Sequence, residues 1–196
     1  MALVVTTAPT AGHATSEERE ASLHRAPFGR GQTHWGLGGG YAFSIHRNGP
    51  TSRNSTYGAT GASLAIGITD PMGGGAWYGG NIDLMLEGAY LFASQPSTGR
   101  GGGGSVLLRW NWLGGGRFVP FANVGAGIVD LNFNLPSQRD GFNFLLQGGL
   151  GAHVFVTERR ALTAEWRYQH ISNANLRLPN KGVDTSAFLV GATFFY

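Results

Sequence analysis

Apolar and polar residues alternate with a period of two along most of the chain from Thr33 onward. Successive side chains of a β-strand point to opposite sides of a sheet, so this pattern predicts strands and not helices. Eight such segments can be recognised between breaks in the alternation, and together they predict an all-β chain. They cover residues 33–45, 57–69, 76–92, 103–113, 118–130, 141–157, 161–171 and 185–196.

Each segment has one apolar face and one small or polar face. Segment 76–92, for example, places Leu84 and Leu86 on one face and Asp83 and Glu87 on the other, while segment 118–130 is the least regular. In a soluble sandwich the polar face would meet water and the apolar face a second sheet. In a membrane barrel the apolar face would meet lipid and the polar face would fill the lumen. Alternation alone fits both architectures.

Three features favour the membrane barrel. The segments, at roughly 11–17 residues, exceed typical soluble strands and suffice to cross a bilayer at a tilt. Glycines gather on the inward parity, as a narrow interior requires. Long breaks at 47–56, 93–100, 131–140 and 172–184 alternate with short ones at 70–75, 114–116 and 158–160. We therefore predict an eight-stranded antiparallel up-and-down transmembrane β-barrel in the outer membrane, with both termini on the periplasmic side.

Composition excludes several other classes of protein. No apolar run approaches the roughly 18 residues of a membrane-spanning helix. Cysteine is absent, which rules out a disulfide framework, a thiol nucleophile and a zinc–thiolate site. The net charge is only +3, and the arginines are scattered instead of forming the basic patch of a nucleic-acid-binding surface. The histidines lack metal-ligand spacing, so we expect no metal. We likewise expect no cofactor and no nucleic-acid partner.

The chain divides into two parts. Residues 33–196 form the predicted barrel. Residues 1–32 read as a flexible lead-in, with a short helix around 17–24, and their first residues are interpreted as the remnant of a signal peptide because they end in small side chains.

The candidate chemistry lies at the end of segment 161–171. His170 and Ser172 share the parity of Trp166 and Tyr168, so they project from the lipid-facing wall. Polar side chains are unexpected on that surface and therefore suggest a function. Asp184 opens the next segment on the same wall. A serine hydroxyl is a poor nucleophile unless a base removes its proton, and a carboxylate keeps that base in the right tautomer. Ser172, His170 and Asp184 therefore form a candidate catalytic triad.

Over residues 167–184 the sequence resembles the lipid A 3-O-deacylase family, outer-membrane enzymes that remove an ester-linked acyl chain from the lipopolysaccharide anchor. The family's H-x-S-N motif falls on His170, Ser172 and Asn173, and its acidic residue falls on Asp184, where Glu is usual. The resemblance implies that Asn173 and Asn180 help to build the oxyanion hole. It also implies a metal-free serine esterase acting on lipid A.

Other interpretations stay open at this stage. His at a barrel rim, Ser and Asn at a loop start and Asp after a turn are all common without catalysis, and the chain would then be a non-catalytic barrel with a structural or binding role. A barrel acyltransferase is another alternative. A homodimer is compatible with the sequence but not required by it. The charged residues with inward parity predict a lumenal salt-bridge network: Asp83, Glu87, Arg109, Glu165 and Arg167.

Overall fold

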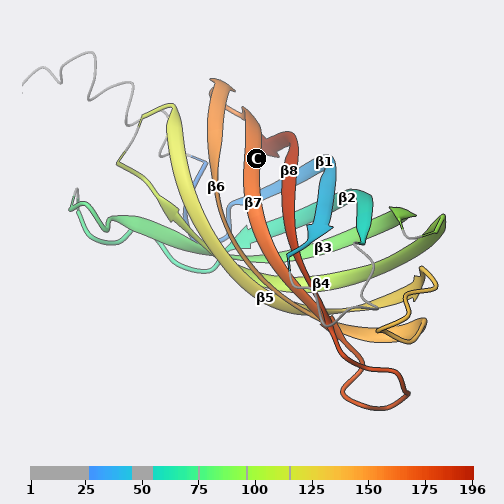
Figure 1. Ribbon diagram of the computed structural model, residues 1–196. Coiled ribbons are helices and arrows are strands. Elements are labelled where there is room, and N and C mark those ends of the chain that lie inside the picture. The colour runs from blue at the N-terminus through green and yellow to red at the C-terminus, as the bar shows by residue number, and fades with distance from the viewer. Residues whose placement is uncertain (1–26, 46–54, 75, 96, 115) are drawn as a thin grey trace, which may run out of the picture.

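The computed structural model describes residues 27–45, 55–74, 76–95, 97–114 and 116–196. Within them, eight antiparallel strands pair in chain order, and β1 also pairs with β8, which closes the barrel seen in Figure 1. This confirms the predicted up-and-down barrel. None of the described residues belongs to a helix that is long and apolar enough to cross a membrane. The strands are β1 (Thr33–Ser44), β2 (Thr56–Gly67), β3 (Gly80–Gln95), β4 (Gly99–Trp112), β5 (Phe118–Asn132), β6 (Gly141–Thr157), β7 (Arg160–Ser172) and β8 (Val183–Phe195).

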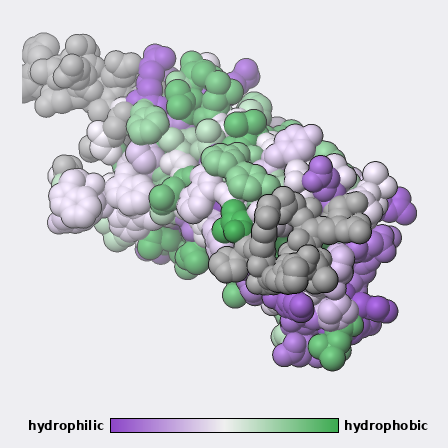
Figure 2. All heavy atoms as spheres, in the orientation of Figure 1, coloured by the Kyte–Doolittle hydropathy of each residue, from purple (hydrophilic) through white to green (hydrophobic). Residues whose placement is uncertain are grey.

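The parity of the alternation correctly assigns the two faces of the wall. Large apolar side chains of the predicted outer face, such as Leu37, Leu86, Leu150 and Val190, are exposed. Figure 2 shows apolar side chains over the wall between the two ends and hydrophilic ones gathered at the end that carries the β7–β8 connection. A wall covered with exposed aliphatic groups is the surface that a bilayer solvates.

The connections divide the barrel into two ends. We call the end with connections 45–55, 96–98, 133–140 and 173–182 the loop end, and the opposite end, where β1 begins and β8 finishes, the terminal end. Two predicted loop lengths were wrong: the β3–β4 connection is only 96–98, and the β2–β3 connection is 68–79. β4 begins at Gly99, four residues before the predicted start at Gly103, and the strands approach closely there: a Cβ at Gly99 would lie 2.2 Å from the Asn132 carbonyl oxygen.

Apolar clusters occupy the interior at both ends of the barrel. At the loop end the cluster includes Tyr57, Phe133 and Ile171. At the terminal end Phe28 packs edge-on against Phe195 with ring centroids 5.1 Å apart. Phe28 lies in the segment expected to be a flexible lead-in, so its buried ring extends the folded unit at least to this residue. The rest of that expectation, including the helix around 17–24, falls on residues 1–26, outside the described part of the chain.

A network of charged side chains fills the lumen between the two clusters. Arg167 donates two hydrogen bonds to Glu87, at 2.6 and 3.1 Å, and two to Glu165, at 2.5 and 3.0 Å. Arg109 Nη2 lies 3.9 Å from Glu165 Oε2. The carboxylate of Asp83 accepts hydrogen bonds from the side chains of Asn81 and Asn111. These contacts confirm the predicted lumenal salt-bridge network. The inward charges thus stabilise the barrel interior and are not available to the outer wall.

Candidate active site on the outer wall

His170 and Asp184 lie directly opposite each other on neighbouring strands at the loop end. The β7–β8 register pairs them, and both have the parity of the exposed residues Phe188 and Val190. His170 Nδ1 is 2.7 Å from Asp184 Oδ1, with side-chain exposures of 36% and 20%. Adjacent strands in register bring facing side chains within reach without any loop rearrangement. The structure therefore places a histidine–carboxylate couple on the lipid-facing wall, as the parity predicted.

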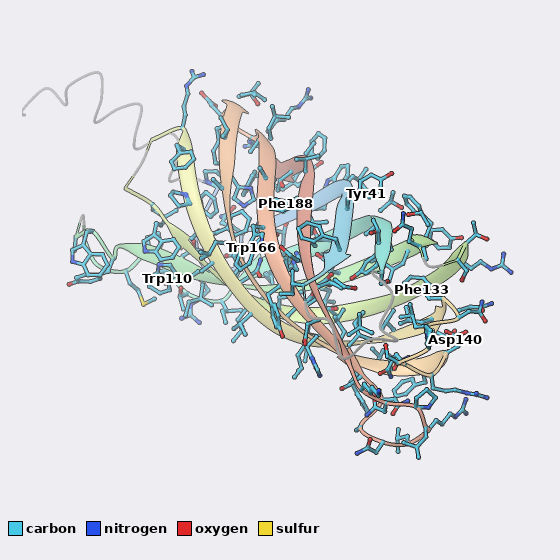
Figure 3. The ribbon with its side chains drawn as sticks, viewed as in Figure 1. Tyr41, Trp110, Phe133, Asp140, Trp166 and Phe188 are labelled. Atoms are coloured by element: carbon cyan, nitrogen blue, oxygen red, sulfur yellow. The ribbon has the colours of Figure 1, made fainter. Side chains whose placement is uncertain are left out.

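Tyr168 is a further member of this cluster that the sequence did not reveal. Its hydroxyl donates a 2.7 Å hydrogen bond to Asp184 Oδ1, the same oxygen that contacts His170. Two residues earlier on the same face of β7, Trp166 Nε1 donates a 2.7 Å hydrogen bond to Ser186 Oγ. Figure 3 shows Trp166 among the side chains of this wall. Trp166 and Tyr168 of β7 thus both form hydrogen bonds to β8. Tyr168, the one nearer the loop end, contacts the acid of the candidate triad.

Ser172 is the last residue of β7 and lies on the same face as His170. It is partly exposed, and its register partner on β6 is the exposed Phe144. Residues two apart along a strand have Cα atoms about 6.5 Å apart. Within the described residues the Ser172 hydroxyl makes no hydrogen bond, so it is free to turn toward His170. Because Asp184 engages Nδ1, the ring nitrogen left for Ser172 is Nε2.

Asn173 and Asn180 lie in the β7–β8 connection and bond to each other. Asn180 Oδ1 accepts a 2.9 Å hydrogen bond from the Asn173 backbone N–H. Asn173 Nδ2 donates to the Arg177 carbonyl at 2.8 Å, and Asn180 Nδ2 donates to Asn175 Oδ1 at 3.1 Å. Asn173 is buried, and its side chain faces the loop interior. These bonds order the loop after Ser172, and the oxyanion-hole role of the two asparagines stays a prediction.

The surroundings of the couple are apolar. On the β6 side, His170 is paired in register with Leu146 and Ser172 with Phe144, and both partners project outward. Phe142 stacks edge-on against Phe144 at a centroid distance of 5.1 Å. A polar couple bordered by exposed aromatic and aliphatic groups suits a substrate that joins a polar head to hydrocarbon chains.

Comparison with known proteins identifies the family. The family model described as "Lipid A 3-O-deacylase (PagL)" matches residues 28–193, nearly the whole barrel. The chain belongs to this family. The protein "Lipid A deacylase PagL" from Bordetella bronchiseptica (strain ATCC BAA-588 / NCTC 13252 / RB50) is 29% identical over 126 residues, which cover 63% of this chain and 66% of that relative. The match thus spans slightly less than two thirds of the relative's length.

Solved structures agree on the fold. The crystal structure of the outer membrane enzyme PagL matches with a TM-score of 0.57 at 15% identity, covering 81% of this chain and 97% of that one. The crystal structure of Neisserial surface protein A matches with a TM-score of 0.61 at 13% identity, covering 83% and 96%. Together with the family membership, the closed eight-stranded barrel makes this chain an outer-membrane protein.

Proposed function

We propose that this protein is a serine esterase that hydrolyses the ester-linked acyl chain at the 3-O position of lipid A. The observation that carries the proposal is the 2.7 Å contact between His170 Nδ1 and Asp184 Oδ1 on the lipid-facing wall, with Ser172 two residues along the same face. A paired imidazole and carboxylate beside a serine hydroxyl is the arrangement that activates a serine nucleophile. The match to the lipid A 3-O-deacylase family supplies the substrate class.

In the first step Ser172 Oγ attacks the ester carbonyl carbon while His170 Nε2 takes the hydroxyl proton. Asp184 remains ionised and stabilises the imidazolium that forms. The tetrahedral intermediate collapses as the bond to the sugar oxygen breaks, and His170 returns the proton to that oxygen. The products of this step are an acyl ester on Ser172 and lipid A with a free hydroxyl.

In the second step water attacks the acyl-enzyme. His170 accepts a proton from this water and then returns it to Ser172 Oγ as the acyl bond breaks, which releases a free fatty acid and restores the serine. Neither step needs an external oxidant or reductant, because an ester and water are converted into an alcohol and an acid.

The substrate would approach laterally within the bilayer. Its acyl chains would lie along the exposed apolar wall near Phe144, Leu146 and Phe188, which provides binding without a deep pocket. This approach requires the loop end to face the outer leaflet and both termini to face the periplasm. The lipid A-binding unit would be the single barrel, because His170, Ser172 and Asp184 all come from one chain; whether the barrel forms a homodimer stays a prediction.

The decisive experiment compares cells that express the wild type or Ser172→Ala. We expect wild-type cells to release the 3-O-linked fatty acid and to show lipid A lighter by that chain, with both changes abolished in the variant. Folding of both proteins is verified by the shift in electrophoretic mobility between heated and unheated barrel. Unchanged lipid A in wild-type cells would support a non-catalytic barrel, heavier lipid A an acyltransferase, and an active Ser172→Ala would end the assignment of the nucleophile.

A further inference from the structure

Two connections at the loop end are joined to each other beside the candidate active site. In the β5–β6 connection the Ser137 carbonyl accepts a 2.9 Å hydrogen bond from the Lys181 N–H of the β7–β8 connection. In return the Arg139 N–H donates to the Pro179 carbonyl at 2.8 Å, and Gln138 forms an isolated β-bridge with Asn180. Residues forty or more positions apart in sequence are thus joined at the loop that follows Ser172.

Gln138 is the buried centre of this junction. Its exposed fraction is 1%, although glutamine is usually exposed. Its Nε2 donates to Asn143 Oδ1 at 2.6 Å, and its Oε1 accepts a 3.1 Å hydrogen bond from the Gly182 backbone N–H. Both ends of the amide are therefore occupied. Because Asn143 of β6 holds one end of the Gln138 amide, the other end helps to determine the position of the Gly182 N–H.

Gly182 in turn lies against the ring of His170. It has a φ of +73°, in the left-handed region that favours glycine, and a Cβ built there would be 2.9 Å from His170 Cε1 and 3.6 Å from Nε2. The backbone of Gly182 thus borders the edge of the imidazole that includes Nε2. Asp184 holds the opposite nitrogen. The ring is confined between these two groups.

We propose that Gln138 is a positioning residue that acts through Gly182 to hold the His170 ring with Nε2 directed toward Ser172. The inference rests on the proposed esterase function and deepens it by adding a residue from a separate loop. The Gln138 side chain acts on His170 indirectly, through the hydrogen bond that its Oε1 accepts from the Gly182 N–H. By this argument Gln138, and not the β5–β6 connection as a whole, belongs to the active-site machinery.

The test uses the full chain purified in detergent micelles, with hydrolysis of lipid A measured as released fatty acid. Gln138→Met keeps the approximate length of the side chain but removes both hydrogen bonds, and we expect kcat to fall roughly tenfold with KM nearly unchanged. Gly182→Ala should lower kcat about a hundredfold, because its methyl group displaces the ring itself. The ¹⁵N resonances of the His170 imidazole should shift in both variants, independently of turnover.

Two control variants separate positioning from general loop order. Gly31→Ala introduces a methyl group at a φ of +80° with no atom within 4 Å, at the terminal end, so it carries the same backbone strain without touching the site. Asp140→Asn weakens the hydrogen bonds to the Phe133 and Asn134 N–H groups in the β5–β6 connection but leaves Gln138 in place. Both should retain kcat within about twofold of the wild type.

The possible results are distinguishable. An active wild type whose kcat and His170 resonances are unaffected by Gln138→Met would overturn the positioning role while leaving the esterase intact. An equal loss of kcat in Asp140→Asn would show that only loop order matters, which also overturns it. A wild type that releases no fatty acid would refute the proposed function itself.

Discussion

Replacing Asp184 with asparagine tests the electrostatic part of the proposed triad. The amide has nearly the same shape as the carboxylate and keeps a group opposite His170, but it removes the negative charge next to Nδ1. It can also donate a hydrogen bond, which favours the wrong imidazole tautomer. The fold should tolerate the change, because Asp184 lies at the rim of the wall with 20% of its side chain exposed.

The size of the effect follows from the geometry. Two unit charges about 4 Å apart interact by about 4 kcal/mol at an effective dielectric constant of about 20, which corresponds to about a thousandfold in rate. Both side chains lie at the loop-end rim of the wall and are partly exposed, 36% for His170 and 20% for Asp184, so polar surroundings at the membrane interface would screen the charges and reduce the benefit. We therefore expect kcat to fall by roughly 10²- to 10³-fold. KM should change little, because Asp184 contacts His170 and Tyr168 and stabilises charge that develops only during reaction.

The assay is steady-state release of fatty acid from lipid A in mixed micelles by the purified barrel. Asp130→Asn is the matched control, since Asp130 is an exposed carboxylate at the same end of the barrel on β5; it should keep kcat within twofold of the wild type. Asp184→Glu restores the charge and the residue usual in the family, and it should retain most of the activity. If Asp184→Asn turned over at the wild-type rate, the carboxylate would have no part in catalysis.

Two further predictions concern neighbouring residues. Tyr168→Phe removes the hydroxyl that contacts Asp184 Oδ1 and should lower kcat by roughly three- to tenfold with KM nearly unchanged, because the carboxylate loses a hydrogen bond that orients it; a rate equal to the wild type would show that the bond is incidental. Arg167→Met leaves the lumenal carboxylates without their main partner and should lower the free energy of unfolding by about 3–5 kcal/mol in urea titrations followed by tryptophan fluorescence. Arg30→Met breaks only the exposed pair with Asp70 and should cost less than about 1 kcal/mol, so equal losses in the two variants would contradict the network.

The sequence alone determined the strands and the side of the wall on which each residue lies. A strand repeats every two residues, so parity is a local property that any run of alternating residues displays. It placed Leu86 on the outside, Glu87 in the lumen and His170 on the lipid-facing wall, and the structure confirms all three. The H-x-S-N motif and its distance from Asp184 are likewise local enough to be recognised in one chain.

The tertiary structure decided what depends on register and on contacts between distant segments. The predicted fourth segment began at Gly103, but β4 begins at Gly99, where only a residue without a side chain fits beside the Asn132 carbonyl of β5. Tyr168 had the parity of a lipid-facing residue, and only the pairing of β7 with β8 brought its hydroxyl to Asp184. Gln138 had no distinguishing pattern at all, because its role arises from the packing of two irregular loops. The alternation along one strand determines whether a side chain points to lipid or to the lumen. Which residue of another strand or loop it contacts is determined by the register of all eight strands in the closed barrel.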